Sequence, residues 1–147
     1  MNREIVYAVS FALLPTGVLA DGDFGTREEA ARLADTMIAI VDSDGLEMAI
    51  KAMHDPQQPF VSTRMGVNLF EGSIVIADNR EPETIAADYS ETVDLNGNPV
   101  WPIIASAAEV EGDALLKWYH YDTQEEYDYK CFSKRSERSN ATVMVCR

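Results

Sequence analysis

The stretches LLKWYHY at residues 115–121, YDYKCFS at 127–133 and TVMVC at 142–146 decide the fold of this chain. All three are rich in aromatic and β-branched residues, which pack well on the pleated surface of a sheet. Short polar segments separate them. We therefore predict three consecutive antiparallel strands that close the domain.

The last two of these strands carry both cysteines of the sequence, Cys131 and Cys146. If the polar stretch 134–140 joins the strands as a hairpin, the two cysteines sit opposite each other near its open end. In an exported protein such a pair is a candidate disulfide. The alternative is two free thiols, and we favour the disulfide provided that the chain is exported.

Helical patterns precede the strands. Thr26-Arg27-Glu28-Glu29 is typical of a capping box, in which the threonine hydroxyl accepts from the third helical amide and Glu29 reaches back. Apolar residues then recur at helical spacing and predict a first helix, namely Ala30, Leu33, Ala34, Met37, Ile38 and Val41. After a break at 42–45, residues 46–53 predict a second, shorter helix that two prolines end.

Between these helices and the closing strands the pattern is mixed. A short apolar run at 74–77 follows Glu71-Gly72-Ser73 and predicts a strand leaving a turn. Residues 78–95 predict a long polar loop with a helical turn, 96–99 a tight turn and 100–110 a helix. The order predicts an α+β fold, with helices packed on one face of an antiparallel sheet and a loop-covered pocket on the other.

The first twenty residues have the anatomy of a signal peptide. An uncharged, mostly apolar run at 5–14 follows a short polar start and is ended by Pro15-Thr16-Gly17. Small residues then lead to Ala20, which suits the last position before a signal-peptidase cut. The alternative is a buried N-terminal strand or helix. We favour a signal peptide at 1–20, which leaves residues 21–147 as a single domain.

The charge balance excludes some partners. The chain carries 25 acidic and 12 basic residues, a formal net charge of −13. Such a chain repels phosphate backbones and anionic membrane surfaces, so we expect no nucleic-acid partner. No segment after residue 20 has the roughly 20 apolar residues of a transmembrane helix. We therefore expect a soluble periplasmic or secreted domain with no membrane anchor in the mature chain.

Four stretches together resemble the single Cache domain, the extracytoplasmic small-molecule sensor module of bacterial chemoreceptors and histidine kinases, which has a PAS-like fold. They follow the family's order over nearly the whole predicted domain. They are residues 45–53 with the following Asp55-Pro56 and Pro59-Phe60-Val61, EGSIVIA at 71–77, DLNGNPV at 94–100, and the strand residues 115–121 and 129–133.

Two departures from the family pattern fall near its pocket. After the 71–77 stretch the family usually has His-Pro, whereas this chain has Asp78-Asn79. The usual aromatic positions before the turn hold GVN at 66–68. Both departures bear on the ligand more than on the fold.

The resemblance also implies a ligand-facing lysine, which Lys130 matches within one residue of register. A lysine buried among aromatic residues needs an anion, and a small carboxylate ligand would supply one; the alternative is a surface lysine paired with nearby acids. Arg64, near the expected pocket mouth, is a second candidate. Alternation puts His120 on the face of Trp118, where it either donates to an anion or packs in the core. Tyr129 offers a hydroxyl, or packs as strand tyrosines usually do.

Patterns for catalysis and metal binding are scarce. Two histidines and two cysteines do not supply the three or four ligands of a zinc site, and no glycine-rich phosphate loop occurs. His54 ends a predicted helix, where a histidine commonly interacts with terminal carbonyls. The acids at 125–128 are typical of a solvated edge. We expect no enzymatic activity, no metal and no cofactor.

These observations predict a soluble periplasmic Cache-type domain that binds a small polar metabolite, a short carboxylate by resemblance, for sensing or signalling in chemotaxis. Lacking an anchor, it would act through a membrane receptor or kinase partner. The alternative is a periplasmic accessory or protein-interaction module that uses the same fold with a collapsed pocket.

Overall fold

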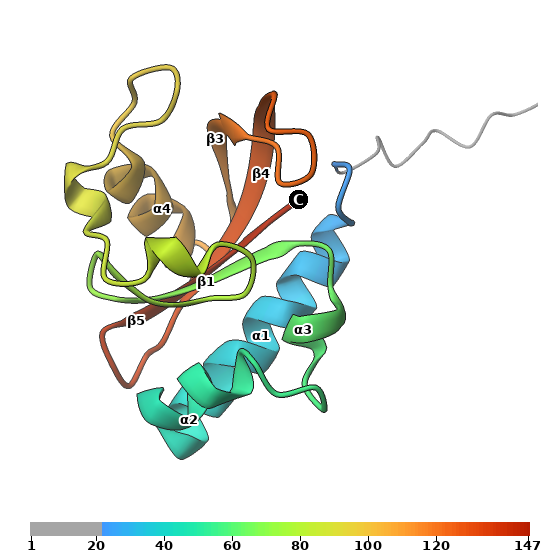
Figure 1. Ribbon diagram of the computed structural model, residues 1–147. Helices are drawn as coiled ribbons and strands as arrows, with labels where there is room; N and C mark the ends of the chain where they lie inside the picture. The colour runs from blue at the N-terminus through green and yellow to red at the C-terminus, as the bar shows by residue number, and fades with distance from the viewer. Residues whose placement is uncertain (1–21) are drawn as a thin grey trace, which may run out of the picture.

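The computed structural model describes residues 22–147, so the predicted signal peptide lies outside the described residues. An antiparallel sheet of five strands, in the order β2-β1-β5-β4-β3, forms its centre (Figure 1). The strands are β1 (Gly66–Glu71), β2 (Ile74–Asp78), β3 (Asp113–Tyr119), β4 (Glu126–Arg135) and β5 (Ala141–Cys146). The helices are α1 (Arg27–Asp44), α2 (Leu46–Ala52), α3 (Pro59–Ser62) and α4 (Val100–Glu109), with the 3-10 turns η1 (Pro82–Thr84) and η2 (Tyr89–Glu91). The predicted α+β class is confirmed.

The predicted capping box starts α1. The Thr26 hydroxyl accepts from the Glu29 amide at 3.2 Å, and the Glu29 carboxylate accepts from the Thr26 amide at 2.8 Å. All six apolar residues that predicted the helix are buried. Gly45 ends α1 with φ 90°, a conformation that glycine adopts without strain. The local pattern was therefore sufficient to place this helix.

The sheet is covered on both faces. On β5, Met144 and Cys146 line a cavity on one face, and alternation turns Val143 and Val145 toward α1 on the other. α4 lies on the cavity face (Figure 1), where its first residue, Val100, also lines the cavity. The expectation that all helices share one face is thus wrong for α4, because the cavity face also needs an apolar cover.

The strand β1 is absent from the sequence-based prediction. It pairs with β2 through a tight turn at Gly72 and with β5 along its whole length, from Gly66 opposite Cys146 to Glu71 opposite Ala141. Five of its six residues are buried, so it shows no alternation of apolar and polar residues. A strand buried on both faces cannot be recognised by its period.

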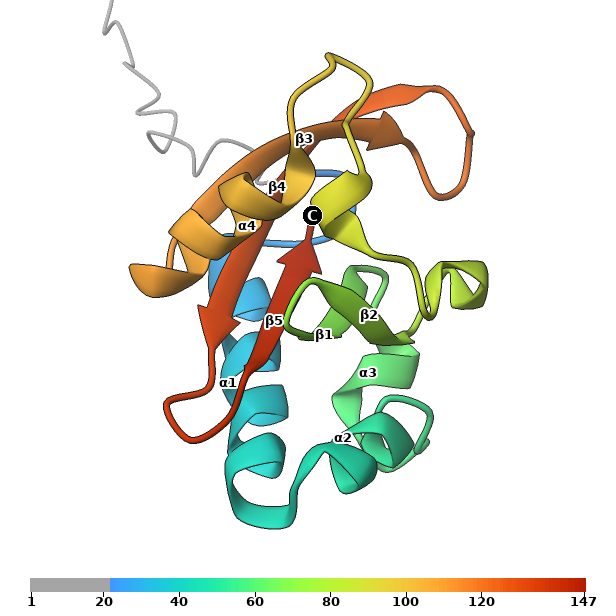
Figure 2. The ribbon, with the colours of Figure 1, turned by 90° about the vertical axis from the view of Figure 1, so that its left-hand side faces the viewer.

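The hairpin of β4 and β5 carries the predicted disulfide. Cys131 lies directly opposite Cys146 in the register, and the two are joined. Lys130 and Arg147, the next pair, exchange both backbone hydrogen bonds. The cysteines therefore occupy a non-hydrogen-bonded pair, in which side chains stand closest together. Figure 2 shows β5 lying between β4 and β1.

Within residues 22–147, no helix is both long and apolar enough to cross a membrane.

Candidate ligand pocket

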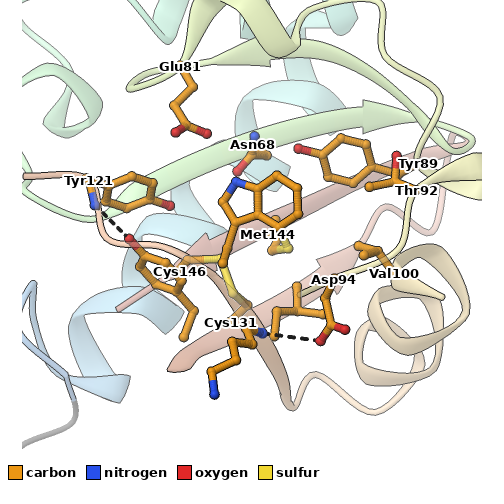
Figure 3. Close-up of a pocket in the computed structure, with 14 residues that line it drawn as sticks. Asn68, Glu81, Tyr89, Thr92, Asp94, Val100, Tyr121, Cys131, Met144 and Cys146 are labelled. Atoms are coloured by element: carbon orange, nitrogen blue, oxygen red, sulfur yellow. Dashed lines mark hydrogen bonds between the residues drawn. A yellow bond between two sulfur atoms is a disulfide. The ribbon is translucent and has the colours of Figure 1, made fainter. Parts of the chain in front are cut away.

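A small cavity of about 60 Å³ lies between the sheet and the segments that cover it. Its floor comes from β1, β3, β4 and β5, and its cover comes from the segment 81–94 and the start of α4 (Figure 3). The lining residues are Asn68, Glu81, Tyr89, Thr92, Asp94, Val100, Leu116, Lys117, Trp118, Tyr121, Tyr129, Cys131, Met144 and Cys146. The disulfide thus forms part of the wall.

Asp88 attaches the cover to the sheet edge. One of its carboxylate oxygens accepts from the Ser73 hydroxyl at 2.6 Å and from the amide and hydroxyl of Ser90. The hydrogen bond from Ser73, followed by those from Ser90, holds the pKa of Asp88 below its usual range. The backbone of Asp88 also forms an isolated antiparallel β-bridge with that of Ile74. These contacts set where Tyr89, the next residue, meets the cavity.

Asp94 organises the other end of the cover. Burial opposes its ionisation, but backbone hydrogen bonds from Asn98, Lys117 and Asn96 outweigh that effect and lower its pKa. The distances from the three amide nitrogens to its carboxylate are 2.9, 3.3 and 3.0 Å respectively. Asp94 is therefore a structural carboxylate that ties the 94–98 turn to β3, although it lines the cavity.

Asn68 brings a polar side chain into the apolar floor. It is buried, and its amide nitrogen donates to a carboxylate oxygen of Asp78 at 2.7 Å. Since that hydrogen bond fixes the amide orientation, the amide oxygen is left on the cavity side (Figure 3). Asp78 itself accepts from the backbone of Arg80 and Glu81 and from the Thr84 hydroxyl, so its hydrogen bonds are made within the loop.

Glu81 turns its carboxylate toward Asn68 and Tyr121 (Figure 3). Burial is the main cause that raises its pKa, and repulsion from Asp78 and Glu83 adds to it, whereas the charge of Arg80 lowers it. Among the described residues its carboxylate makes no hydrogen bond and no ion pair. A carboxylate held in this way is costly to desolvate unless a ligand compensates it.

Aromatic side chains form much of the wall. Tyr129 is buried, and its hydroxyl donates to the Tyr119 carbonyl at 3.1 Å while it accepts from the Tyr121 amide at 3.0 Å. Burial raises the pKa of Tyr89 to about 12, with further contributions from nearby carboxylates. Tyr121 packs against Gly66, where any side chain would collide with the tyrosine hydroxyl. The glycine that departs from the family pattern therefore makes room for Tyr121.

Two of the five residues predicted to bind ligand, Trp118 and Tyr129, line this cavity, and the other three do not. Tyr129 and Cys131 face the cavity, so the strand's alternation turns Lys130 to the opposite face, where it lies across from Leu115 of β3.

His120 and Arg64 meet at the N-terminal end of the described chain instead. The His120 Nδ1 atom accepts from the amides of Asp122 and Thr123, so Nε2 carries the proton and faces the Asp23 carboxylate at 3.1 Å. Arg64 donates to the Asp23 carbonyl at 3.1 Å. His120 is thus a hydrogen-bonded packing residue, the second of its two predicted roles.

The sequence did not single out Asn68, Glu81, Tyr89 or Met144, which complete the cavity. Asn68 and Met144 face each other across β1 and β5, so finding them required the unpredicted strand. Glu81 and Tyr89 lie in the segment that was expected to be a polar loop. Only the folded path of that loop brings them to the sheet.

Neither a protein-family model nor a curated protein matches this sequence. Solved structures do match its fold. A methyl-accepting chemotaxis protein from Vibrio parahaemolyticus RIMD 2210633 is similar with a TM-score of 0.61 at 10% identity, over 82% of this chain and 83% of that one. A Cache chemosensory domain described for carboxylic acid recognition gives a TM-score of 0.58 at 10% identity, over 82% and 86%. The fold is that of a Cache domain.

A third Cache-like match is the periplasmic sensor domain of a chemotaxis protein, with a TM-score of 0.56 at 12% identity over 82% of this chain and 88% of that one. The expected PAS-like Cache architecture is therefore confirmed as a fold. At 10–12% identity the likeness extends to the path of the backbone and not to the lining of the pocket. All three neighbours are chemotaxis or chemosensory proteins.

Proposed function

We propose that this chain is an extracytoplasmic sensory domain that binds a small polar metabolite in the cavity beneath the 81–94 cover. The observation that carries the proposal is the cavity itself, enclosed between the sheet and its cover in a Cache fold, with the carboxylate of Glu81 and the amide of Asn68 turned into it. The Glu81 carboxylate is half-buried and has no partner among the described residues, which leaves it available to a ligand.

The proposed location is the periplasm, or outside the cell. Residues 1–20 would be removed as a signal peptide and residues 21–147 would form the mature domain. The disulfide between Cys131 and Cys146 supports this location, because such bonds persist in oxidising compartments. Edman or mass-spectrometric identification of the N-terminus in a periplasmic extract tests the cut after Ala20; a chain that keeps Met1 would contradict it.

Binding would act through the cover. Segment 81–94 touches both the sheet and α4, so a ligand that prefers one arrangement of the cover shifts the population toward it. A membrane receptor or kinase that contacts this surface would then read the shift. The carboxylate ligand was expected from the family resemblance, with Lys130 and Arg64 as its candidate cations, and neither of these residues lines the cavity.

The volume of the cavity favours a second candidate function. About 60 Å³ is small beside the roughly 300–1,000 Å³ of most metabolite pockets. A domain with so tight a pocket also suits an accessory or protein-interaction module that binds no metabolite.

Thermal unfolding across a panel of small acids, amino acids, amines and polyols separates the two candidates. A ligand that binds only the folded domain raises the midpoint by mass action, by an amount that grows with ligand concentration. A dose-dependent rise for at least one compound is expected. No rise across the panel would leave the interaction module as the better account.

A further inference from the structure

The charged groups that line the cavity are not equivalent. Three charged residues of the described chain contribute to the lining, namely Glu81, Asp94 and Lys117. Asp94 is engaged by three backbone amides. Lys117 alternates away from Trp118 on β3, and its ammonium lies 3.8 and 3.9 Å from the carboxylates of Glu126 and Asp128 on β4. Glu81 is therefore the one lining charge, among the described residues, that remains for a ligand.

The neighbouring cation Arg80 does not fill this role. Its guanidinium lies over the Tyr121 ring at 5.0 Å and over the Phe24 ring at 5.8 Å. One of its nitrogens also lies 3.1 Å from the Asp122 carboxylate. Arg80 is thus occupied beside the cavity and does not line it.

One uncharged polar group of the cavity, Asn68, also presents a hydrogen-bond acceptor. The amide nitrogen of Asn68 is committed to Asp78, which leaves its oxygen as an acceptor. Tyr89, Tyr121 and Trp118 add aromatic rings, whose faces attract cations. A carboxylate ligand would meet Glu81 without a free cation to offset the repulsion. An ammonium group would find a charged acceptor, a neutral acceptor and aromatic faces.

We propose that the cavity is a site for a small protonated amine, whose ammonium group pairs with Glu81 and donates to the Asn68 oxygen. This proposal rests on the proposed function of the cavity as a ligand site. The volume of about 60 Å³ restricts the ligand to a few heavy atoms in this conformation of the cover. The partial burial of Glu81 favours the pairing, because charge-assisted hydrogen bonds gain strength as water is excluded.

Three probes of nearly equal size test the ligand class: ethanolamine, ethylene glycol and glycolate. Calorimetric titration into the disulfide-bonded domain should detect binding of ethanolamine, with at least tenfold weaker binding of the neutral and anionic probes. Glu81→Gln should weaken ethanolamine binding by about tenfold or more, since it removes the charged acceptor. Glu81→Asp keeps the charge and should retain part of the affinity.

Glu83→Gln is the matched control. Glu83 lies two residues after Glu81 and carries the same charge, but its side chain is exposed and does not line the cavity. The substitution should leave ethanolamine binding within about twofold, and the midpoint of each unliganded variant shows whether it folds. Glycolate binding without ethanolamine binding overturns the amine inference and leaves the proposed function intact. Equal ethanolamine affinity for wild type and Glu81→Gln also overturns it. If no probe binds and no compound of the thermal-unfolding panel raises the midpoint, both the amine inference and the proposed ligand-binding function fail.

Discussion

Arg147 is a charged side chain that is only 1% exposed, and its partner determines what that burial costs. Two of its guanidinium nitrogens donate to the two carboxylate oxygens of Asp113 at 2.8 and 2.9 Å. The hydrogen bond from Arg147 is the main cause that lowers the pKa of Asp113, and the charge of Arg27 adds to it. This two-bond pair fixes the edge strand β3 to the residue that follows β5.

Asp113→Asn should lower the free energy of unfolding by about 2 kcal/mol, because it removes charge-assisted hydrogen bonds from a buried guanidinium. Urea denaturation at pH 7 measures the change. Asp128→Asn, at an exposed site on β4, is the control and should change stability by less than about 0.5 kcal/mol. Equal effects of the two substitutions would contradict the structural role of the pair.

The ion pair of Asp113 and Arg147 also predicts part of the loss of folding stability at acidic pH. The folded pKa of Asp113 is lower than its unfolded pKa, so its contribution to stability is complete above about pH 4, the unfolded value. That contribution is lost as the pH falls through the lower folded value. Asp113→Asn should therefore show a smaller loss of stability than wild type between neutral and strongly acidic pH, and parallel curves would count against it.

Glu81 predicts that ligand binding is also lost in acid, but at a higher pH than the contribution of Asp113 to stability. Its raised pKa means that it gains a proton at a higher pH than an ordinary glutamate, and the neutral acid cannot pair with an ammonium group. The groups that act on it are Asp78 and Glu83, which raise its pKa, and Arg80, which lowers it. Tyr89, Tyr121 and Tyr129 face it as neutral groups, since their own pKa values are raised.

Ethanolamine affinity should thus fall on acidification before the fold is lost. Titrations at several pH values, with unfolding midpoints measured alongside, separate the two events. An affinity that stays constant until the domain unfolds would rule out Glu81 as the partner.

Lys130 lies between two residues of β4 that line the cavity, but its own side chain faces the other side of the sheet. Successive side chains of a strand face opposite sides, so a slip of one position exchanges the two faces. The prediction matched Lys130 to the family position within one residue, and the structure puts Tyr129 and Cys131 in the wall. Only the register with β3 and β5 decides the face, and that register is not visible in the strand's own residues.

At the scale of the element, α1 owes its start to two side chains. Thr26→Ala removes the acceptor for the Glu29 amide and should lower the free energy of unfolding by about 1 kcal/mol. Thr36→Ala in the middle of the same helix is the control. Its hydroxyl donates to the Arg32 carbonyl, which already takes part in the helix, and alanine is the better helix former. Chemical denaturation should therefore show a loss only for Thr26→Ala.

Elements with a local signal were the ones that the sequence predicted. α1 has its capping box and apolar period, and the β4–β5 hairpin has its paired cysteines. β1 lacked such a signal because both of its faces are buried. The cover at 81–94 is placed by hydrogen bonds to Ser73 and β3. A segment that owes its position to distant partners has no period of its own to be recognised.

At the scale of the whole molecule, the disulfide closes a loop of 15 residues between two core strands. Replacing both Cys131 and Cys146 by alanine should lower the free energy of unfolding by about 3 kcal/mol, chiefly because the unfolded chain regains freedom. Dithiothreitol should lower the unfolding midpoint of wild type to that of the double variant and leave the variant unchanged. A reductant that affects both equally would show that its effect is unrelated to this bond.

The fold class was therefore predictable and the pocket was not. The helices α1, α2 and α4 and the closing strands are each specified within a few consecutive residues, and their order is enough to suggest the architecture. The cavity wall combines side chains from four strands, the cover and α4, so it exists only when the whole chain has folded. Departures such as GVN at 66–68 indicated that the lining differs from the family, without indicating what replaces it.

The position of β5 at the sheet centre has a consequence for biosynthesis. β1 and β4 are joined only through β5, whose residues pair with partners 70 to 80 positions earlier, as Glu71 does with Ala141 and Gly66 with Cys146. A ribosome makes β5 after every other element of this sheet, and the closure of so long a loop is slow. The nascent chain therefore carries two separate hairpins that cannot merge until its final strand emerges. In the export that we propose, this delay would keep the sheet open while the polypeptide enters a translocation channel.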